Sequence, residues 1–213
     1  MTIQEKISFL SKISLLSSVS SELLSELAEI STERDYAKGD LIIQEQMDAL
    51  EIFIIVKGSV SVYRSIPTGE IINLATLGPN EILGEISFID NQTRSATVEA
   101  LQPTTVLVFP AADVKKLFLQ DPKTALHVME ILVVRVKELH NKIEDLTTKN
   151  LEQRTMRALE ILAKYYPDHK ITLSQEELAE IIGATRARVT EVLNLLQTKG
   201  KVKLSHKTIE VLS

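Results

Sequence analysis

The sequence predicts an α+β protein: an N-terminal antiparallel β-roll with flanking helices, a long helix, and a C-terminal winged helix-turn-helix. Short β-rich runs separated by glycines fill the segment from about 32 to 110. The segment after Pro122 keeps a helical period without glycine or proline up to position 149. A capping box at Ser174 marks the start of the first of two short helices. The expected domains are 1–121, 122–149 and 150–213.

Composition limits the class of protein before any motif is considered. The chain has 213 residues, of which 44% are hydrophobic, so it can bury one large or two modest cores. It has no cysteine, which excludes disulfides, cysteine nucleophiles and thiolate-bound iron–sulfur clusters and favours a cytoplasmic location. The N-terminus has no long apolar run, so we expect neither a signal peptide nor a membrane span.

Charge is unevenly distributed along the chain. The net charge is −5, and the acidic residues dominate the first 150 positions. Lys and Arg outnumber Asp and Glu after residue 150. A C-terminal basic excess is compatible with a nucleic-acid partner, although alone it is also ordinary surface variation.

The N-terminal half divides into helices and then strands. Apolar residues recur at helical spacing over 1–31, which predicts short helices. The following part predicts short strands punctuated by glycine turns, typical of a compact barrel or roll. These strands are Leu41–Ile43, Ile52–Val56, Val60–Tyr63, Ile71–Leu74, Ala96–Val98 and Thr105–Phe109.

Residues from about Val114 to Lys149 are expected to be helical, and the long helix carries a seam of apolar residues. They follow steps of 3, 4, 3, 4 and 3, which is a heptad pattern. The pattern predicts a parallel homodimer, while packing of the stripe on the chain's own β domain is the alternative. The seam residues are Met129, Leu132, Val136, Leu139, Ile143 and Leu146.

After a helix over Leu151–Tyr166, the C-terminal part predicts a helix-turn-helix. Ser174 and Glu177 form a capping box, and Gly183 ends the helix that they open. Thr185 is the expected cap of a second helix, whose apolar face points inward. A solvated helical hairpin is the simpler alternative.

The second of these helices presents a polar face near its N-terminus. Arg186 and Arg188 can pair with guanine, Glu191 can accept from cytosine, and Asn194 can pair with adenine or hold phosphate. Ala187 can touch a thymine methyl, and Thr190 shares the outward face. The alternating runs Lys201–Leu204 and Thr208–Leu212 predict a hairpin wing around His206 and Lys207, which would lie over the phosphate backbone and favours the DNA-binding reading.

The segment from Gly84 to Ala96 has the composition of a pocket for a sugar joined to a phosphate. Glycine lets the backbone approach a ligand closely, and Glu85 can accept from a ribose hydroxyl. Arg94 offers a planar fork of donors that matches phosphate oxygens, and Ser95 adds a neutral donor. Arg94 could instead be a structural ion-pair partner of Glu85.

With these features in this order, the chain resembles the CRP/FNR superfamily of bacterial transcription regulators. The resemblance covers nearly the whole chain. Besides the cassette and the seam helix, its markers are Lys38-Gly39-Asp40, Ile54–Val60, Thr185-Arg186 and Val189-Thr190. It implies a homodimer that binds a pseudo-palindromic DNA operator, contacts RNA polymerase and responds to cAMP or cGMP, without a required cofactor.

The resemblance also implies which residues bind the effector. Glu85 would bind the ribose 2′-hydroxyl, and Arg94 and Ser95 the cyclic phosphate. The implied site comprises Gly84, Glu85, Ile86, Arg94, Ser95 and Ala96, together with Arg135, Leu139 and His140 from the long helix.

The chain departs from the cAMP-responsive pattern at the places where base identity and operator sequence are read. The loop between Glu85 and Arg94 is one residue shorter, and Leu139 and His140 replace the threonine and serine that contact adenine. Ala187 and Glu191 replace a common glutamate and arginine, which implies a different operator half-site.

The sequence is compatible with other interpretations of several residues. His140 could bond a nucleobase, ligate haem iron, or be a seam residue bonded to backbone or water. The remaining histidines have no metal-ligand spacing, and we predict no metal site. A regulator that needs no ligand is one alternative function. A phosphodiesterase is the other. That enzyme would need a metal cluster or a paired acid and base, which the sequence does not offer, so we predict no enzyme.

Overall fold

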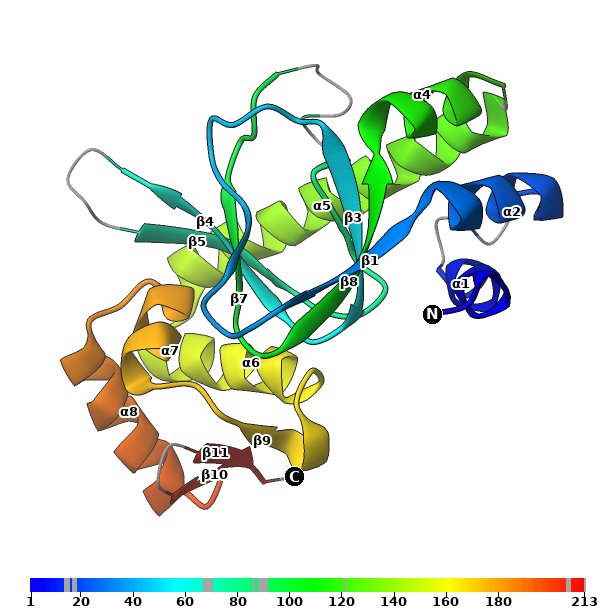
Figure 1. Cartoon of the computed structure of the whole chain (residues 1–213). Helices are drawn as coiled ribbons and strands as arrows, with labels where there is room; N and C mark the ends of the chain where they lie inside the picture. Colours follow the sequence, from blue (N-terminus) through cyan, green and yellow to red (C-terminus); the bar gives the residue numbers. More distant parts are fainter. Residues whose placement is uncertain are drawn as a thin grey trace.

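The computed structural model describes residues 1–212 except 14, 15, 17, 18, 67–70, 86, 88–91, 121, 206 and 207. Between 117 and 146 it describes only part of the side chains. At the N-terminus, α1 (Ile3–Leu10) and α2 (Ser21–Ile30) each begin at a capped residue, Thr2 and Ser20. The two helices pack together at one side of the β-sheets (Figure 1).

Eight strands in the described part of the first 110 residues form two antiparallel four-stranded sheets. The sheet orders are β1-β8-β3-β6 and β2-β7-β4-β5. The strands are β1 (Thr32–Tyr36), β2 (Leu41–Ile43), β3 (Glu51–Lys57), β4 (Val60–Ser65), β5 (Ile71–Leu77), β6 (Ile82–Leu83), β7 (Thr97–Ala100) and β8 (Thr104–Pro110).

The alternation of side chains along β3 explains how the β-roll and the N-terminal helices share a core. Phe53 and Ile55 belong to the apolar cluster that joins the two sheets. Ile52 and Ile54, on the other face, belong to the cluster formed with α1 and α2. Because successive side chains of a strand point to opposite faces, one nearly continuous apolar run serves both cores.

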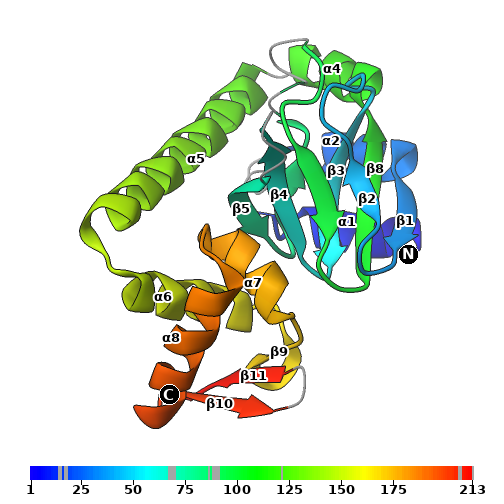
Figure 2. The same ribbon diagram turned by 90° about the vertical axis from the view of Figure 1, so that its left-hand side faces the viewer.

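Two helices follow the β-roll and lead out of it. These are α4 (Ala111–Gln120) and the long α5 (Pro122–Thr148), which runs along one side of the β-roll (Figure 2). Asn150 caps α6 (Leu151–Ala163) with a capping box to Gln153, so the chain breaks between α5 and α6. Among the described residues, no helix is long and apolar enough to cross a membrane.

The C-terminal part has its own core around α6. A short 3-10 helix, η2 (Pro167–His169), leads to β9 (Lys170–Ile171) and to the helix pair α7 (Gln175–Ile182) and α8 (Arg186–Thr198). β10 (Val202–Ser205) and β11 (Thr208–Val211) follow. Buried apolar side chains from each of these helices and strands except η2 fill the core; they include Leu159, Ile171, Leu178, Leu193, Val202 and Ile209.

The predicted α+β class with a β-roll, a long helix and a winged helix-turn-helix is confirmed. The sequence missed three strands. β1 is exposed along most of its length, and β6 and β9 have two residues each, so none shows a clear apolar alternation. The wing is therefore a three-stranded sheet, ordered β10-β11-β9.

Helix ends also differ from expectation. The helix expected to reach Tyr166 ends at Ala163. Thr185 has the extended backbone of a cap residue, but its side chain makes no capping hydrogen bond to α8. The capping box at Ser174 and the left-handed Gly183 at the end of α7, with φ of 70°, are confirmed.

Candidate ligand-binding and DNA-binding sites

The predicted ligand cassette begins directly after β6. Gly84 adopts φ of +84°, a conformation that favours glycine, and a Cβ there would collide with the Arg94 guanidinium. Glu85 follows it and is half-buried, while Ile86 lies outside the described residues. The backbone of Gly84 is thus shaped to bring the cassette and Arg94 together.

Arg94 is the most constrained polar residue of the cassette. Its side chain is only 6% exposed. Nη1 donates to the Gly84 carbonyl over 3.2 Å, Nη2 donates to the Glu51 carbonyl, and Cζ lies 5.8 Å from the centre of the Phe53 ring. A guanidinium has five N–H groups, so these two bonds leave donors for a ligand.

The environment of Arg94 combines burial with nearby acids. Burial lowers the pKa of Arg94, and the negative charges of Glu51 and Glu85 oppose that shift. The main chain of Arg94 is held as well: its N–H donates to the Met47 carbonyl, and its carbonyl accepts from Gln46, both over 2.9 Å. Arg94 is a fixed donor and not a flexible surface cation.

The other cassette residues differ in exposure. Ser95 is exposed, and Ala96 is buried. The buried Ser87 hydroxyl donates to the Thr93 carbonyl over 3.2 Å and ties the two ends of the cassette loop together. Sequence reasoning missed Ser87, although its place between Glu85 and Arg94 was a usable signal.

Most of the described seam residues of α5 are exposed in their own chain. Met129, Val136, Leu139 and Ile143 are between 48% and 61% exposed, and Leu132 is half-buried. The alternative that the stripe packs on its own β domain is therefore wrong for these four residues. The side chain of Leu146 lies outside the described set.

Two of the α5 positions predicted near the ligand are described, and both are exposed. Leu139 is 50% exposed, and His140 is exposed as well. The Arg135 side chain lies outside the described set. Within the described residues, no group of three His, Cys, Asp or Glu side chains could hold a metal ion.

On α8, most of the predicted reading face is exposed. Arg186, Ala187, Arg188, Glu191 and Asn194 are all exposed. Val189, Leu193 and Leu196 are fully buried on the opposite side, as the helical period predicted.

Thr190 differs from that group because it is half-buried and already bonded. Its hydroxyl lies 2.6 Å from Gln175 Oε1 and 2.9 Å from the Arg186 carbonyl. A hydroxyl has one hydrogen, so Thr190 links α7 to α8 or closes its own helical turn. Its predicted role on the outward face is thus less direct than that of its neighbours.

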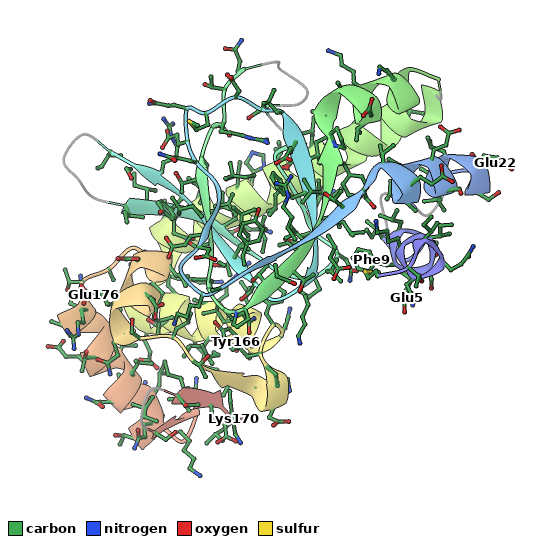
Figure 3. The ribbon with its side chains drawn as sticks, in the orientation of Figure 1. Glu5, Phe9, Glu22, Tyr166, Lys170 and Glu176 are labelled. Atoms are coloured by element: carbon green, nitrogen blue, oxygen red, sulfur yellow. The ribbon has the colours of Figure 1, made fainter. Side chains whose placement is uncertain are left out.

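A cleft of about 420 Å³ lies between the N-terminal ends of α7 and α8 and the wing. Its polar lining comes from Ser174, Gln175, Glu176, Arg186, Ser205 and Thr208. Glu176 Oε2 lies 3.7 Å from Arg186 Nη1, and Figure 3 shows Glu176 at the outer side of this region. Sequence reasoning did not single out Gln175 or Glu176. His206 and Lys207 lie outside the described residues.

Comparisons with known proteins agree with this arrangement. Residues 33–121 match the family model described as a cyclic nucleotide-binding domain, and residues 153–213 match the Crp-like helix-turn-helix domain. The chain is 29% identical over 178 residues to the cyclic AMP receptor protein of Thermus thermophilus, covering 84% of this chain and 82% of that protein.

Further relatives share the architecture. The global nitrogen regulator of Synechococcus elongatus is 28% identical over 185 residues, covering 83% of each chain. The fold is also that of the c-di-GMP responsive global regulator CLP of Xanthomonas campestris, with a TM-score of 0.75 at 20% identity, covering 91% of this chain and 100% of that one.

The fold and the two matched domains define a DNA-binding transcription regulator with a cyclic nucleotide-binding domain. The matched relatives are regulators and not enzymes, as the sequence predicted. The chain belongs to the CRP/FNR family of transcription regulators.

Proposed function

We propose that this protein is a homodimeric transcription regulator whose affinity for its operator is set by a small effector bound in the β-roll. The observation that carries the proposal is the joining, in one chain, of a cassette with a fixed arginine fork and a helix-turn-helix with an exposed reading face. The proposed domains are the sensor 1–121, the dimerisation helix 122–149 and the DNA-binding domain 150–213.

DNA would be read by the N-terminal half of α8 in the major groove. Arg186 and Arg188 are exposed and suited to guanine, and Glu191 to cytosine N4. The remaining proposed contacts are Thr185, Ala187, Thr190 and Asn194, with His206 and Lys207 from the wing on phosphate.

Dimerisation would bury the exposed apolar stripe of α5 against a second copy. Large aliphatic side chains at heptad positions on an uncovered helix are suited to a parallel coiled coil. A two-fold dimer presents two α8 helices and so favours a pseudo-palindromic operator with half-sites about one helical turn apart. RNA polymerase is the further partner expected of the family.

A cyclic nucleotide, cAMP or cGMP, is the effector that the cassette chemistry fits best. Arg94, which is held in place by hydrogen bonds to two main-chain carbonyls, would bind the cyclic phosphate. Ser95 would bind beside it, and Glu85 would bind the ribose. Gly84, Ile86 and Ala96 would line the same pocket, and Arg135, Leu139 and His140 would approach it from α5. Several relatives are named for cyclic AMP.

A second candidate is a regulator with another effector or with none. Two observations favour it: Arg94 is already bonded to main-chain carbonyls, and Leu139 offers no hydrogen bond to a base. In that case the β-roll would serve mainly dimerisation.

Control by an effector requires that it bind the DNA-competent state more tightly. A coupling free energy of about 1–3 kcal/mol changes DNA affinity about 5- to 150-fold. The change would arise where the two α5 helices meet, because they set the spacing of the two α8 helices.

The experiment starts by selecting an operator from random DNA and measuring its affinity by fluorescence anisotropy. Arg186→Ala is expected to weaken operator binding about tenfold or more, since a bidentate arginine–guanine contact is worth about 1–3 kcal/mol. Lys164→Ala, an exposed cation at the end of α6, is the control. Equal operator affinity for both variants would sink the assignment of α8 as the reading helix.

The effector is then tested by titrating the protein with cAMP and with cGMP in a calorimeter, and by repeating the operator titration with each nucleotide. Binding of either nucleotide together with a change in operator affinity supports the sensor. Operator binding that neither nucleotide alters, without calorimetric binding, moves the conclusion to the second candidate.

A further inference from the structure

Four turns at one end of the β-roll contact the DNA-binding part of the same chain. They carry Lys38 between β1 and β2, Ser59 between β3 and β4, Gly78 after β5, and Gln102 between β7 and β8. We call these four residues the socket. Figure 3 shows Tyr166 at this boundary, below the sheets.

Polar contacts between described residues cross the boundary. Gln102 Nε2 donates to Ser59 Oγ over 2.9 Å and to the Tyr165 carbonyl over 3.0 Å. Lys38 Nζ lies 2.8 Å from Glu177 Oε1 and 3.4 Å from the Thr172 carbonyl. The bridges reach both the turn after α6 and the first helix of the helix-turn-helix.

Apolar packing also crosses the boundary. Leu101, in the turn before Gln102, is 5% exposed and belongs to the core of the DNA-binding part. Tyr166 is 6% exposed, and its burial raises the pKa of its hydroxyl to about 12. The two parts therefore share a core at this contact.

Gly78 shows that the fit is close. A Cβ built on Gly78 would overlap the ring of Tyr165. The other five glycines in the described part of the chain have positive φ, but Gly78 does not, so the backbone there accepts any residue. Glycine is needed at position 78 to admit the Tyr165 ring.

One part of the same contact is repulsive. Tyr63 donates to Glu99 Oε2 over 3.1 Å on the sheet side. Burial and the charge of Glu99 raise the pKa of Glu180 on α7, with smaller contributions from Glu176 and Glu177. The negative charges of Glu99 and Glu180 therefore oppose each other at this contact.

The contact leaves the DNA-reading surface open. α7 lies between the β-roll and α8 in both views, so α8 is on the far side of α7 from the socket (Figures 1 and 2). Docking therefore holds the helix-turn-helix without covering the exposed face of α8.

We propose that Gly78 and Tyr165 are positioning residues for DNA binding: the socket holds each helix-turn-helix in one orientation, so the β-roll sets the geometry of the two α8 helices directly and not only through α5. The proposal rests on α8 being the reading helix. Loss of docking leaves two helix-turn-helix parts that must be ordered on the operator, which weakens specific binding.

The first test measures the distance between the two parts in the full-length dimer. The natural chain has no cysteine, so Glu29→Cys on α2 and Gln197→Cys on α8, both exposed, accept spin labels without background. Labelled chain is mixed and exchanged with excess unlabelled chain, so that the dimers that carry label have one labelled subunit. Pulsed electron resonance should give one narrow distance, and Gly78→Ala should broaden it.

Two further variants separate docking from damage to the β-roll. In a Tyr165→Ala background, which removes the ring, Gly78→Ala should add no further broadening. Gln102→Ala, which removes one bridge without adding an atom, should broaden the distance on its own. An unchanged distance distribution in Gly78→Ala overturns the proposal. So does a Gly78→Ala change that adds the same broadening in the natural chain and in the Tyr165→Ala background.

The second test compares operator and random DNA. Gly78→Ala should lower operator affinity about tenfold while leaving affinity for random DNA unchanged, because phosphate contacts do not need matched half-sites. Full operator affinity in a variant whose distance has broadened would also overturn the proposal. The distance measurement needs neither effector nor operator, so it stands if Arg186→Ala disproves the proposed reading helix.

Discussion

At the residue scale, the Arg94 side chain has a structural role and a proposed ligand-binding role. Its guanidinium already donates to the carbonyls of Gly84 and Glu51, which joins the cassette to the start of β3. An arginine so placed contributes to the stability of the β-roll as well as to any anion site.

Arg94→Ala is therefore expected to lower the free energy of unfolding by about 2–4 kcal/mol, because two carbonyls lose a charged donor and a buried side chain is removed. Urea unfolding followed by circular dichroism measures this. The neighbouring Ser95→Ala, at an exposed position, should change stability by less than about 0.5 kcal/mol. A loss of less than about 1 kcal/mol in Arg94→Ala would mean that these contacts add little to stability.

The order and spacing of Gly84, Glu85, Arg94 and Ser95 were enough to predict which residues gather at the cassette. They could not predict where the Arg94 side chain would point, because one of its acceptors is a main-chain carbonyl 43 residues earlier. The Thr190 to Gln175 bond was hidden for the same reason: it joins side chains 15 residues apart on different helices.

At the element scale, most of the described seam residues of α5 are exposed within their own chain. Ile143 is 61% exposed near the end of the helix. Exposure of an aliphatic seam of this kind to water is unfavourable, and its burial in a coiled coil lowers the free energy.

Ile143→Glu is expected to raise the dissociation constant of the dimer at least about 100-fold, because it places a charge at the seam of both subunits. Sedimentation velocity at several protein concentrations measures this. Lys137→Glu, at an exposed position outside the predicted seam, should leave the dimer intact. If the natural chain sediments as a monomer, or both variants as dimers, the seam is not the interface.

Elements with a clear period were predicted from the sequence, and those without one were missed. The heptad steps in α5 and the apolar runs of β3 and β8 are long enough to show their period. β1 is polar and largely exposed, so its sequence shows no strand period. It is a strand because it pairs with β8. α6 stops at Ala163, before Tyr165 and Tyr166, which pack at the β-roll boundary instead.

At the scale of the whole molecule, the contact between the two parts was beyond sequence reasoning. Lys38 meets the Thr172 carbonyl across 134 positions, and neither residue belongs to a periodic pattern that would reveal the pair. The turn Lys38-Gly39-Asp40 is a marker of the family resemblance, but its role in holding α7 follows only from the fold.

The ion pair of Lys38 and Glu177 makes this contact dependent on pH. Burial alone would raise the pKa of Glu177, but hydrogen bonds from Lys38 and Ser174 outweigh it and lower that pKa below its ordinary value. A depressed carboxylate pKa adds stability above the ordinary value of 4.5 and loses it as the pH falls through the folded pKa. Glu180 acts in the opposite sense, because its raised pKa makes its charge unfavourable as the pH rises.

Lys38→Met should therefore lower the melting temperature at pH 7 by about 1–3 °C, as expected for a partly exposed ion pair, and the difference should shrink below about pH 4. Glu180→Gln should raise the melting temperature at pH 7 and have no effect in acid, which makes it the control of opposite sign. Scanning calorimetry between pH 3.5 and 7 gives both curves. A Lys38→Met difference that stays constant across this range would show that the pair acts by packing and not by charge, since Glu177 is the member of the pair whose charge changes there.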